Sequence, residues 1–152
     1  MRRNIIAFGI AGVVALGAVG FSLYLTNATP AVPAISASEA AATDRPWVVK
    51  LHAQWCPICM LTKGVWERIE QTYAGRVRLV VFDFTDRETT AASRAEAERL
   101  GLTAFFDESG FATGPIVVLD SSTKETRAWI YGSRDFTEYS AAIEAALESA
   151  SR

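Results

Sequence analysis

The chain has 152 residues, 50% of them hydrophobic, and a formal net charge of −2 at pH 7. This length accommodates one ordinary soluble domain, which usually takes about 100 to 200 residues. Acidic and basic residues are nearly balanced and form no basic block, which argues against nucleic acid as a partner.

The N-terminal segment is long, apolar and uncharged. Residues 5–25 read IIAFGIAGVVALGAVGFSLYL, and a helix needs about 20 such residues to cross a hydrocarbon core. Arg2 and Arg3 precede this segment and no Lys or Arg follows before residue 44, so the positive-inside rule places the N-terminus in the cytoplasm. We therefore expect residues 1–25 to anchor the chain in a membrane, with the rest on the extracytoplasmic (periplasmic) side.

A cleaved signal peptide is the alternative for the same segment, with a cut near small residues such as Ala28 or Ala34 and secretion of the product. The apolar part of a signal peptide usually runs about 7 to 15 residues, and this one is longer. Residues 26–44 are rich in Ala, Ser, Thr and Pro, which predicts a flexible linker. Both interpretations export a domain formed by residues 45–152.

This domain is predicted to alternate strands and helices. Short β-branched runs predict the strands, and apolar residues that recur every three or four positions predict the helices. The expected elements are a strand at 47–53, a helix from the cysteines to Gly75 with Leu61, Val65, Ile69 and Tyr73 inward, a strand at 77–84, a helix at 88–101, strands at 115–120 and 126–132 that form a hairpin, and a helix at 135–150 with Phe136, Tyr139, Ile143 and Leu147 inward. This order, βαβαββα, predicts an α/β fold with a mixed sheet.

The two cysteines of the chain, Cys56 and Cys59, lie close together in AQWCPICML, directly after the first predicted strand. A structural disulfide is a poor use of this spacing, because the stabilisation grows with loop length. A structural zinc site usually needs four ligands, and His52 is the single histidine, so no metal site is expected.

Redox chemistry suits the spacing better. If Cys56 opens a helix, its thiolate lies near unpaired backbone N–H groups and the positive end of the helix dipole. Cys59, one turn later, can attack the mixed disulfide that Cys56 forms with a client and so release it. Pro57 fits the first helical turn, where its missing N–H costs little.

A strand that leads into WCPIC and then into a helix resembles the thioredoxin superfamily, and the similarity covers about residues 45–150. The resemblance implies a thioredoxin-like fold with a mixed central sheet flanked by helices. It also implies a thiol:disulfide oxidoreductase that exchanges disulfides with proteins through a redox-active Cys56–Cys59 disulfide, without a bound organic cofactor.

The segment TGPIVVLD resembles the part of the family in which a proline with a cis peptide bond begins a strand beside the cysteines. That role falls to Pro115, and Gly114 is expected to offer backbone groups to an extended client segment. Trp55, Pro57 and Ile58 complete the expected client-binding surface.

The chain departs from the family pattern at several positions. Cytosolic reductases of the family usually read C-G-P-C and strongly oxidising exported members often read C-P-H-C, whereas Ile58 stands in this gap and favours a reductase over a strong oxidant. Lys50 stands where the reductases often bury an Asp. Either its stem lies along the sheet and its ammonium group reaches water, or it lies under the motif near Asp83 and lowers a cysteine pKa.

Two further departures concern the surrounding structure. Gly64 stands where the family often has a proline that kinks the first helix. Residues 102–113 form a longer connection than usual and contain Phe105, Phe106 and Phe111, which either fill the core or form an apolar lip beside Pro115.

Two other functions remain open for the same residues. The first is a Cu(I) carrier, because Cys56, Cys59 and Met60 are soft ligands of the kind that Cu(I) selects. The second is a thioredoxin-like binding module in which the cysteines matter little. For the oxidoreductase we expect a monomer served by a membrane redox partner, and the direction of electron flow and the client stay open.

Overall fold

The computed structural model describes residues 44–152. The predicted membrane anchor or signal peptide, and all of the predicted linker except Asp44, lie outside the described residues. Among residues 44–152, no helix is long and apolar enough to cross a membrane.

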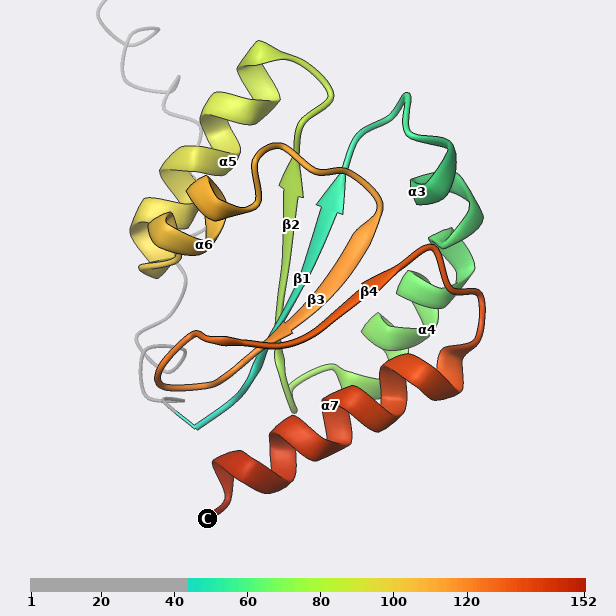
Figure 1. Cartoon of the computed structure of the whole chain (residues 1–152), viewed down its shortest axis with the longest axis vertical. Helices are drawn as coiled ribbons and strands as arrows, with labels where there is room; N and C mark the ends of the chain where they lie inside the picture. Colours follow the sequence, from blue (N-terminus) through green and yellow to red (C-terminus); the bar gives the residue numbers. More distant parts are fainter. Residues whose placement is uncertain (1–43) are drawn as a thin grey trace, which may run out of the picture. The chain divides into compact units, whose positions relative to one another are not determined.

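Four strands form one sheet with helices on both of its faces (Figure 1). The elements are β1 (Trp47–His52), α3 (Pro57–Leu61), α4 (Lys63–Tyr73), β2 (Arg78–Asp83), α5 (Arg87–Leu100), α6 (Thr103–Glu108), β3 (Pro115–Leu119), β4 (Thr126–Tyr131) and α7 (Phe136–Ala150). The strand order is β2-β1-β3-β4, in which β1 pairs parallel with β2 while β3 runs antiparallel to both β1 and β4. The predicted mixed sheet and closing hairpin are confirmed.

The sheet has a separate apolar cluster on each face, because successive side chains of a strand point to opposite sides. Val48 packs in the cluster with α4 and α7, where Ile69 and Ile143 are fully buried. Val49 packs on the other face with Phe82 and the residues of α5 and α6. Both faces of β1 are therefore covered, which explains why its sequence is an almost continuous apolar run.

The ends of α5 follow directly from its sequence. Asp86 caps the N-terminus by accepting a hydrogen bond from the N–H of Thr89, whose hydroxyl accepts one from the N–H of Asp86. Gly101 ends the helix in the left-handed conformation at φ 66°, as its sequence position predicted.

The helix after the cysteines was predicted as continuous, and this is wrong. It is divided at Thr62, which is fully buried and whose hydroxyl donates to the carbonyl of Ile58 at 2.9 Å. Such a hydrogen bond to the preceding turn bends helices. Leu61 is consequently 55% exposed rather than inward, and Trp66 is buried in its place. Gly64 lies inside α4, beyond the division.

The connection at residues 102–113 contains a helix that the sequence analysis did not predict, α6. Phe105 and Phe106 are buried on the α5 side of the sheet, so the core interpretation is confirmed for these two. Phe111 is 59% exposed and its ring lies edge-on to that of Phe84, with centroids 5.6 Å apart.

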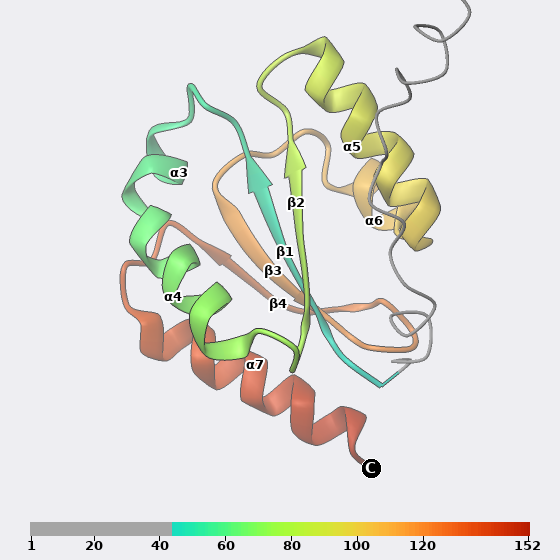
Figure 2. The ribbon, with the colours of Figure 1, turned by 180° about the vertical axis from the view of Figure 1, so that it is seen from behind.

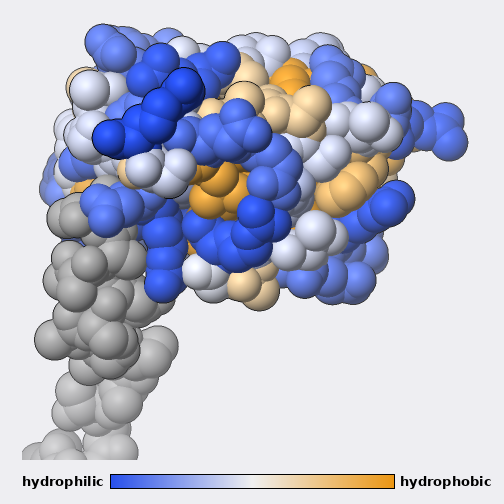
Figure 3. All heavy atoms as spheres, turned by 90° about the horizontal axis from the view of Figure 1, so that it is seen from below, coloured by the Kyte–Doolittle hydropathy of each residue, from blue (hydrophilic) through white to orange (hydrophobic). Residues whose placement is uncertain are grey.

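The surface at the end of the domain where α7 terminates is predominantly hydrophilic. Figure 3 shows this side, on which apolar areas are small and separated by hydrophilic residues. The large exposed apolar side chains that bear on function belong to the region around the cysteines, where Trp55 and Met60 are 61% and 64% exposed.

Candidate redox site

The two cysteines lie where β1 ends and α3 begins (Figure 1). Cys56 is the N-cap residue of α3, and its Sγ accepts a hydrogen bond from the N–H of Cys59 at 3.2 Å. Both residues are 2% exposed and both are free thiols. The prediction that Cys56 opens a helix, with Pro57 in its first turn, is confirmed.

The environment of Cys56 favours its thiolate. Burial raises the pKa of Cys56, but hydrogen bonds outweigh this effect and hold the pKa below its usual value. They come from the Cys59 thiol, the Thr113 side chain and the backbone N–H groups of Cys59 and Ile58. A lowered pKa makes a thiol available as a nucleophile at neutral pH.

The environment of Cys59 has the opposite effect. Burial, together with the hydrogen bond to Cys56, raises the pKa of Cys59 to about 11, and the backbone N–H of Ala53 and, to a smaller extent, the charge of Lys50 partly oppose this rise. The Cys59 thiol also has the carbonyl oxygen of Leu51 as an acceptor at 3.7 Å. The pair therefore consists of one thiol disposed to attack and one that stays protonated until it is needed.

Three predicted client-binding residues surround this pair in sequence and differ in exposure. The indole N–H of Trp55 donates to the carbonyl of Thr85 at 3.0 Å, which holds the ring beside the loop between β2 and α5 while leaving the side chain 61% exposed. Pro57 is exposed at the start of α3. Ile58 is half-buried and packs against the apolar cluster of Ala53 and the two cysteines.

Gly114 brings the start of β3 close to the cysteine loop. Its φ is +108°, and a Cβ at this position would lie 2.8 Å from Cγ2 of Ile58 and 3.0 Å from Cε2 of Tyr131. Its N–H donates to the carbonyl of Leu51 at 2.8 Å. The expectation that Gly114 offers its backbone to a client is thus wrong for the N–H, which the domain itself uses.

Pro115 begins β3 and pairs with Tyr131, as the resemblance implied, but its peptide bond is not cis. No cis peptide bond occurs in the part of the chain that the structure describes. The trans form of an X-Pro bond is the generally favoured one, by about 0.5–1 kcal/mol.

Lys50 lies in the middle of β1 and is buried, with 8% of its surface exposed. Its Nζ lies 5.5 Å from the centroid of the Trp66 ring. Burial lowers the pKa of Lys50, and negative charge on Cys59 and Glu70 opposes this shift. Only a small part of the Lys50 side chain can therefore reach water. The expected proximity to Asp83 is not borne out, since the carboxylates that act on Lys50 belong to α4 and Asp83 acts on His52.

Sequence reasoning missed two residues that the fold brings to the site, Thr113 and Tyr131. Thr113 contacts Cys56 from the segment before β3, and Tyr131 covers Gly114 from the end of β4. The position of Thr113 next to the Gly-Pro pair was a usable signal, because that segment was already expected to lie beside the cysteines. Tyr131 had no comparable signal.

Replacing Thr113 with Val is expected to raise the pKa of Cys56, because one hydrogen bond to its sulfur is lost while the shape of the side chain is kept. The rate of alkylation of Cys56 by iodoacetamide, followed against pH in a Cys59→Ser background, reports that pKa. We expect the midpoint to move upward in Thr113→Val and to stay close to the parent value in Thr113→Ser. Equal midpoints in all three proteins would contradict the role of Thr113.

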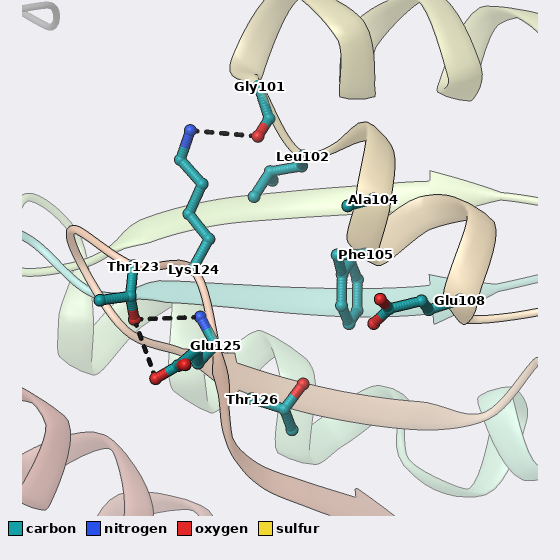
Figure 4. A pocket seen from close by; sticks show the side chains of 9 residues that line it. All are labelled: Gly101, Leu102, Ala104, Phe105, Glu108, Thr123, Lys124, Glu125 and Thr126. Carbon is teal, nitrogen blue, oxygen red and sulfur yellow. Dashed lines mark hydrogen bonds between the residues drawn. The ribbon is translucent and has the colours of Figure 1, made fainter.

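A hollow of about 450 Å³ lies on the far side of the sheet, between the α5–α6 turn and the β3–β4 hairpin (Figure 4). Its lysine, Lys124, donates to the carbonyl of Gly101 at 3.1 Å and to that of Leu100 at 3.4 Å. The lysine therefore caps the C-terminal end of α5, where positive charge is favourable.

Within residues 44–152, no group of three or more His, Cys, Asp or Glu residues could hold a metal ion.

Comparison with known proteins agrees with this geometry. The family model described as Thioredoxin matches residues 35–105, which include β1, both cysteines, β2 and α5. Comparison with the curated proteins gives no match. Among the solved structures that match the chain is the crystal structure of a thiol:disulfide interchange protein, a thioredoxin family protein from Chlorobium tepidum TLS, with 18% sequence identity and a TM-score of 0.48 over 72% of this chain and 84% of that chain. The match of residues 35–105 to the Thioredoxin family model and the two neighbouring cysteines at the start of α3 support a thioredoxin-like oxidoreductase.

Proposed function

We propose that this protein reduces disulfides in client proteins on the extracytoplasmic side of a membrane, through Cys56 and Cys59. The observation that carries the proposal is the opposite displacement of the two cysteine pKa values at the start of α3, lowered for Cys56 and raised to about 11 for Cys59. An attacking thiol and a resolving thiol need these different properties.

The proposed reaction has two exchange steps. The Cys56 thiolate attacks one sulfur of the client disulfide, forming a mixed disulfide and releasing the other client sulfur as a thiolate. Cys59 loses its proton and attacks Sγ of Cys56, which forms the Cys56–Cys59 disulfide and releases the second client sulfur. Both client thiolates take up protons, and two electrons have passed from the protein to the client.

The surroundings of Cys56 suit an extended apolar client segment. Trp55 and Tyr131 are each 61% exposed, and Ile58 lies between the cysteines and Gly114. Aromatic side chains of this kind supply contact area at an interface with little loss of conformational freedom. We propose that Trp55, Pro57, Ile58, Gly114 and Pro115 contact the client, with Gly114 acting through its small size rather than its N–H.

The direction of the reaction is proposed from the groups that stabilise Cys56. A strong oxidant needs a strongly stabilised reduced form, and the hydrogen-bond donors recorded for Cys56 are neutral thiol, hydroxyl and amide groups. Ile58 occupies the gap of the motif and adds no charge there. Electrons for the next turnover would come from a redox partner in the membrane, to which residues 5–25 would anchor the protein. A cleaved, secreted form is the alternative.

The reduction potential of the Cys56–Cys59 couple tests this function. The full chain would be equilibrated with glutathione buffers of graded composition and the disulfide fraction measured by mass after alkylation. A potential near that of thioredoxin, about −270 mV, is expected, whereas a value near about −120 mV would make the protein a disulfide donor. Failure to form the disulfide under any buffer, with retention of one equivalent of Cu(I), would replace the proposal with a copper carrier.

A further inference from the structure

We propose that Lys50 is a positioning residue for the second exchange step, in which its buried ammonium group stabilises the thiolate of Cys59 as that thiolate forms. This inference rests on the proposed function and deepens it. It gives the resolving cysteine a specific electrostatic partner beneath the motif.

The fold places Lys50 on the face of the sheet that α4 covers. Lys50 lies on β1, between β2 and β3, and the neighbouring Val49 and Leu51 are fully buried in the cluster on the opposite face. Its side chain therefore points to the face covered by α4, where Nζ lies over the Trp66 ring. Figure 2 shows α3 and α4 in sequence along the same side of β1.

Lys50 is mostly buried, and no carboxylate of residues 44–152 forms an ion pair with its ammonium group. Two carboxylates on α4 act on Lys50, and Glu70 has the larger effect of the two. Glu70 accepts a hydrogen bond from the indole N–H of Trp66 at 2.6 Å. A buried cation without a bound anion gains most from a negative charge that forms next to it.

Cys59 is the group best placed to provide that charge, because its Sγ lies 3.7 Å from the carbonyl oxygen of Leu51, the residue that follows Lys50 on β1. The charged or titratable groups that act on Lys50 are Cys59 and Cys56 from α3 and Glu70 and Glu67 from α4, with the largest favourable effect from Cys59. His52 also lies on β1. Burial and then the charge of Lys50 lower the pKa of His52, which keeps this imidazole neutral at pH 7. Of the two cysteines, only Cys59 has Lys50 among the main influences on its own pKa.

The effect of Lys50 is largest in the mixed disulfide. Once Cys56 is bonded to the client, it no longer carries charge or accepts the hydrogen bond of Cys59, so both contributions of Cys56 to the raised pKa of Cys59 disappear. Burial still disfavours the Cys59 thiolate, and the Ala53 N–H and the charge of Lys50 still favour it, with Lys50 the one charged side chain among these main influences. The proton of Cys59 leaves to solvent, Lys50 stays an ammonium ion throughout, and the thiolate attacks Sγ of Cys56 while the client sulfur departs as a thiolate.

A small aromatic disulfide separates the two steps. The reduced full chain is mixed with excess 5,5′-dithiobis(2-nitrobenzoate) in a stopped-flow instrument, and release of the coloured thiolate is followed. The first equivalent reports attack by Cys56, and its rate depends on reagent concentration. The second equivalent reports attack by Cys59 on the mixed disulfide, and its rate is independent of reagent concentration. The variants are Lys50→Met and Lys50→Arg, with Arg152→Met as the control for net charge, because Arg152 is exposed after the end of α7 and joins none of the ion pairs found in residues 44–152.

The second phase of Lys50→Met is expected to have a pH midpoint about one unit higher or more, which is the usual effect of an opposite charge within a few ångströms. At pH 7 its rate should fall about threefold, because a tenfold loss of thiolate is partly offset by the greater nucleophilicity of a more basic thiolate. At a pH above both midpoints, the second phase should therefore be faster in Lys50→Met than in the parent protein. Lys50→Arg should keep the parent midpoint, and Arg152→Met should leave the midpoint and the rate unchanged.

The two proposals fail in different ways. An unchanged second-phase midpoint in Lys50→Met would overturn the role of Lys50 and leave the function intact. A second phase that is absent in the parent protein, or that persists in Cys59→Ser, would overturn the resolving role of Cys59 and with it the proposed function. Lys50→Gln, which keeps a polar end at the buried position, gives the same comparison if Lys50→Met does not fold.

Discussion

Replacing Cys59 with Ser is expected to stop the reaction at the mixed disulfide and leave the client covalently attached to Cys56. Cys56 keeps hydrogen bonds from Thr113 and from the N–H groups of Cys59 and Ile58 in this variant, so its thiolate still attacks. No second thiol remains to release the client. Intact-mass measurement after mixing with a disulfide-bonded client should detect the adduct as the main product.

Replacing Cys56 with Ser should abolish exchange instead. Cys59 would be the remaining thiol, and burial still raises its pKa, whereas the pKa of Cys56 in the parent protein is lowered. Less thiolate is therefore available at neutral pH, and no second thiol can resolve a mixed disulfide, so we expect client reduction to slow by about tenfold or more, measured as release of client thiols.

Controls separate this outcome from the alternatives. The double variant Cys56→Ser/Cys59→Ser should trap no client and should unfold at the same denaturant concentration as the single variants. An adduct in Cys56→Ser but not in Cys59→Ser would reverse the two assigned roles. Full biological function of the double variant would mean that the domain serves as a binding module.

The elements that sequence predicted well are those determined by local residue patterns. The β-branched runs of β1 and β2 match strands within one or two residues, and the cap at Asp86 and the glycine at Gly101 enclose α5. The division at Thr62 was not predictable in the same way, because it depends on a threonine hydroxyl that is buried by tertiary packing and bonded to Ile58. The spacing of apolar residues along this segment is helical throughout and therefore does not show the division.

The residues of the site also differ in how far local sequence patterns predicted them. The two cysteines are three residues apart on one helix turn, so their spacing alone indicated their relation. Thr113 and Tyr131 reach the pair through the register of β3 and β4 beside β1, which sequence does not specify, whereas Lys50 lies on β1 itself and was already a candidate from its place six residues before Cys56. The expected cis bond at Pro115 came from family resemblance and was wrong, and no local pattern in the sequence had indicated it.

Replacing Gly114 with Ala is expected to lower the free energy of unfolding by about 3 kcal/mol. Two costs combine, each of about 1–3 kcal/mol: a positive φ of +108° that alanine rarely adopts, and overpacking of a Cβ against Ile58 and Tyr131. Because Ile58 packs on both cysteines, the displacement should also slow attack by Cys56. Chemical denaturation and the alkylation rate of Cys56 measure the two effects.

Gly64→Ala is the matched control for this substitution. A Cβ at Gly64 would meet nothing within 4 Å, and the residue lies inside α4, so alanine should stabilise the protein by about 0.5–1 kcal/mol. The double variant Gly114→Ala/Ile58→Ala removes the shorter of the two contacts at Gly114 and should recover part of the Cys56 reactivity, since the contact with Tyr131 and the strained φ remain. If Gly114→Ala unfolds at the same denaturant concentration as the parent, the close approach of β3 to Ile58 is not required for the fold. Ile58 would then be free to move away from the cysteines during exchange.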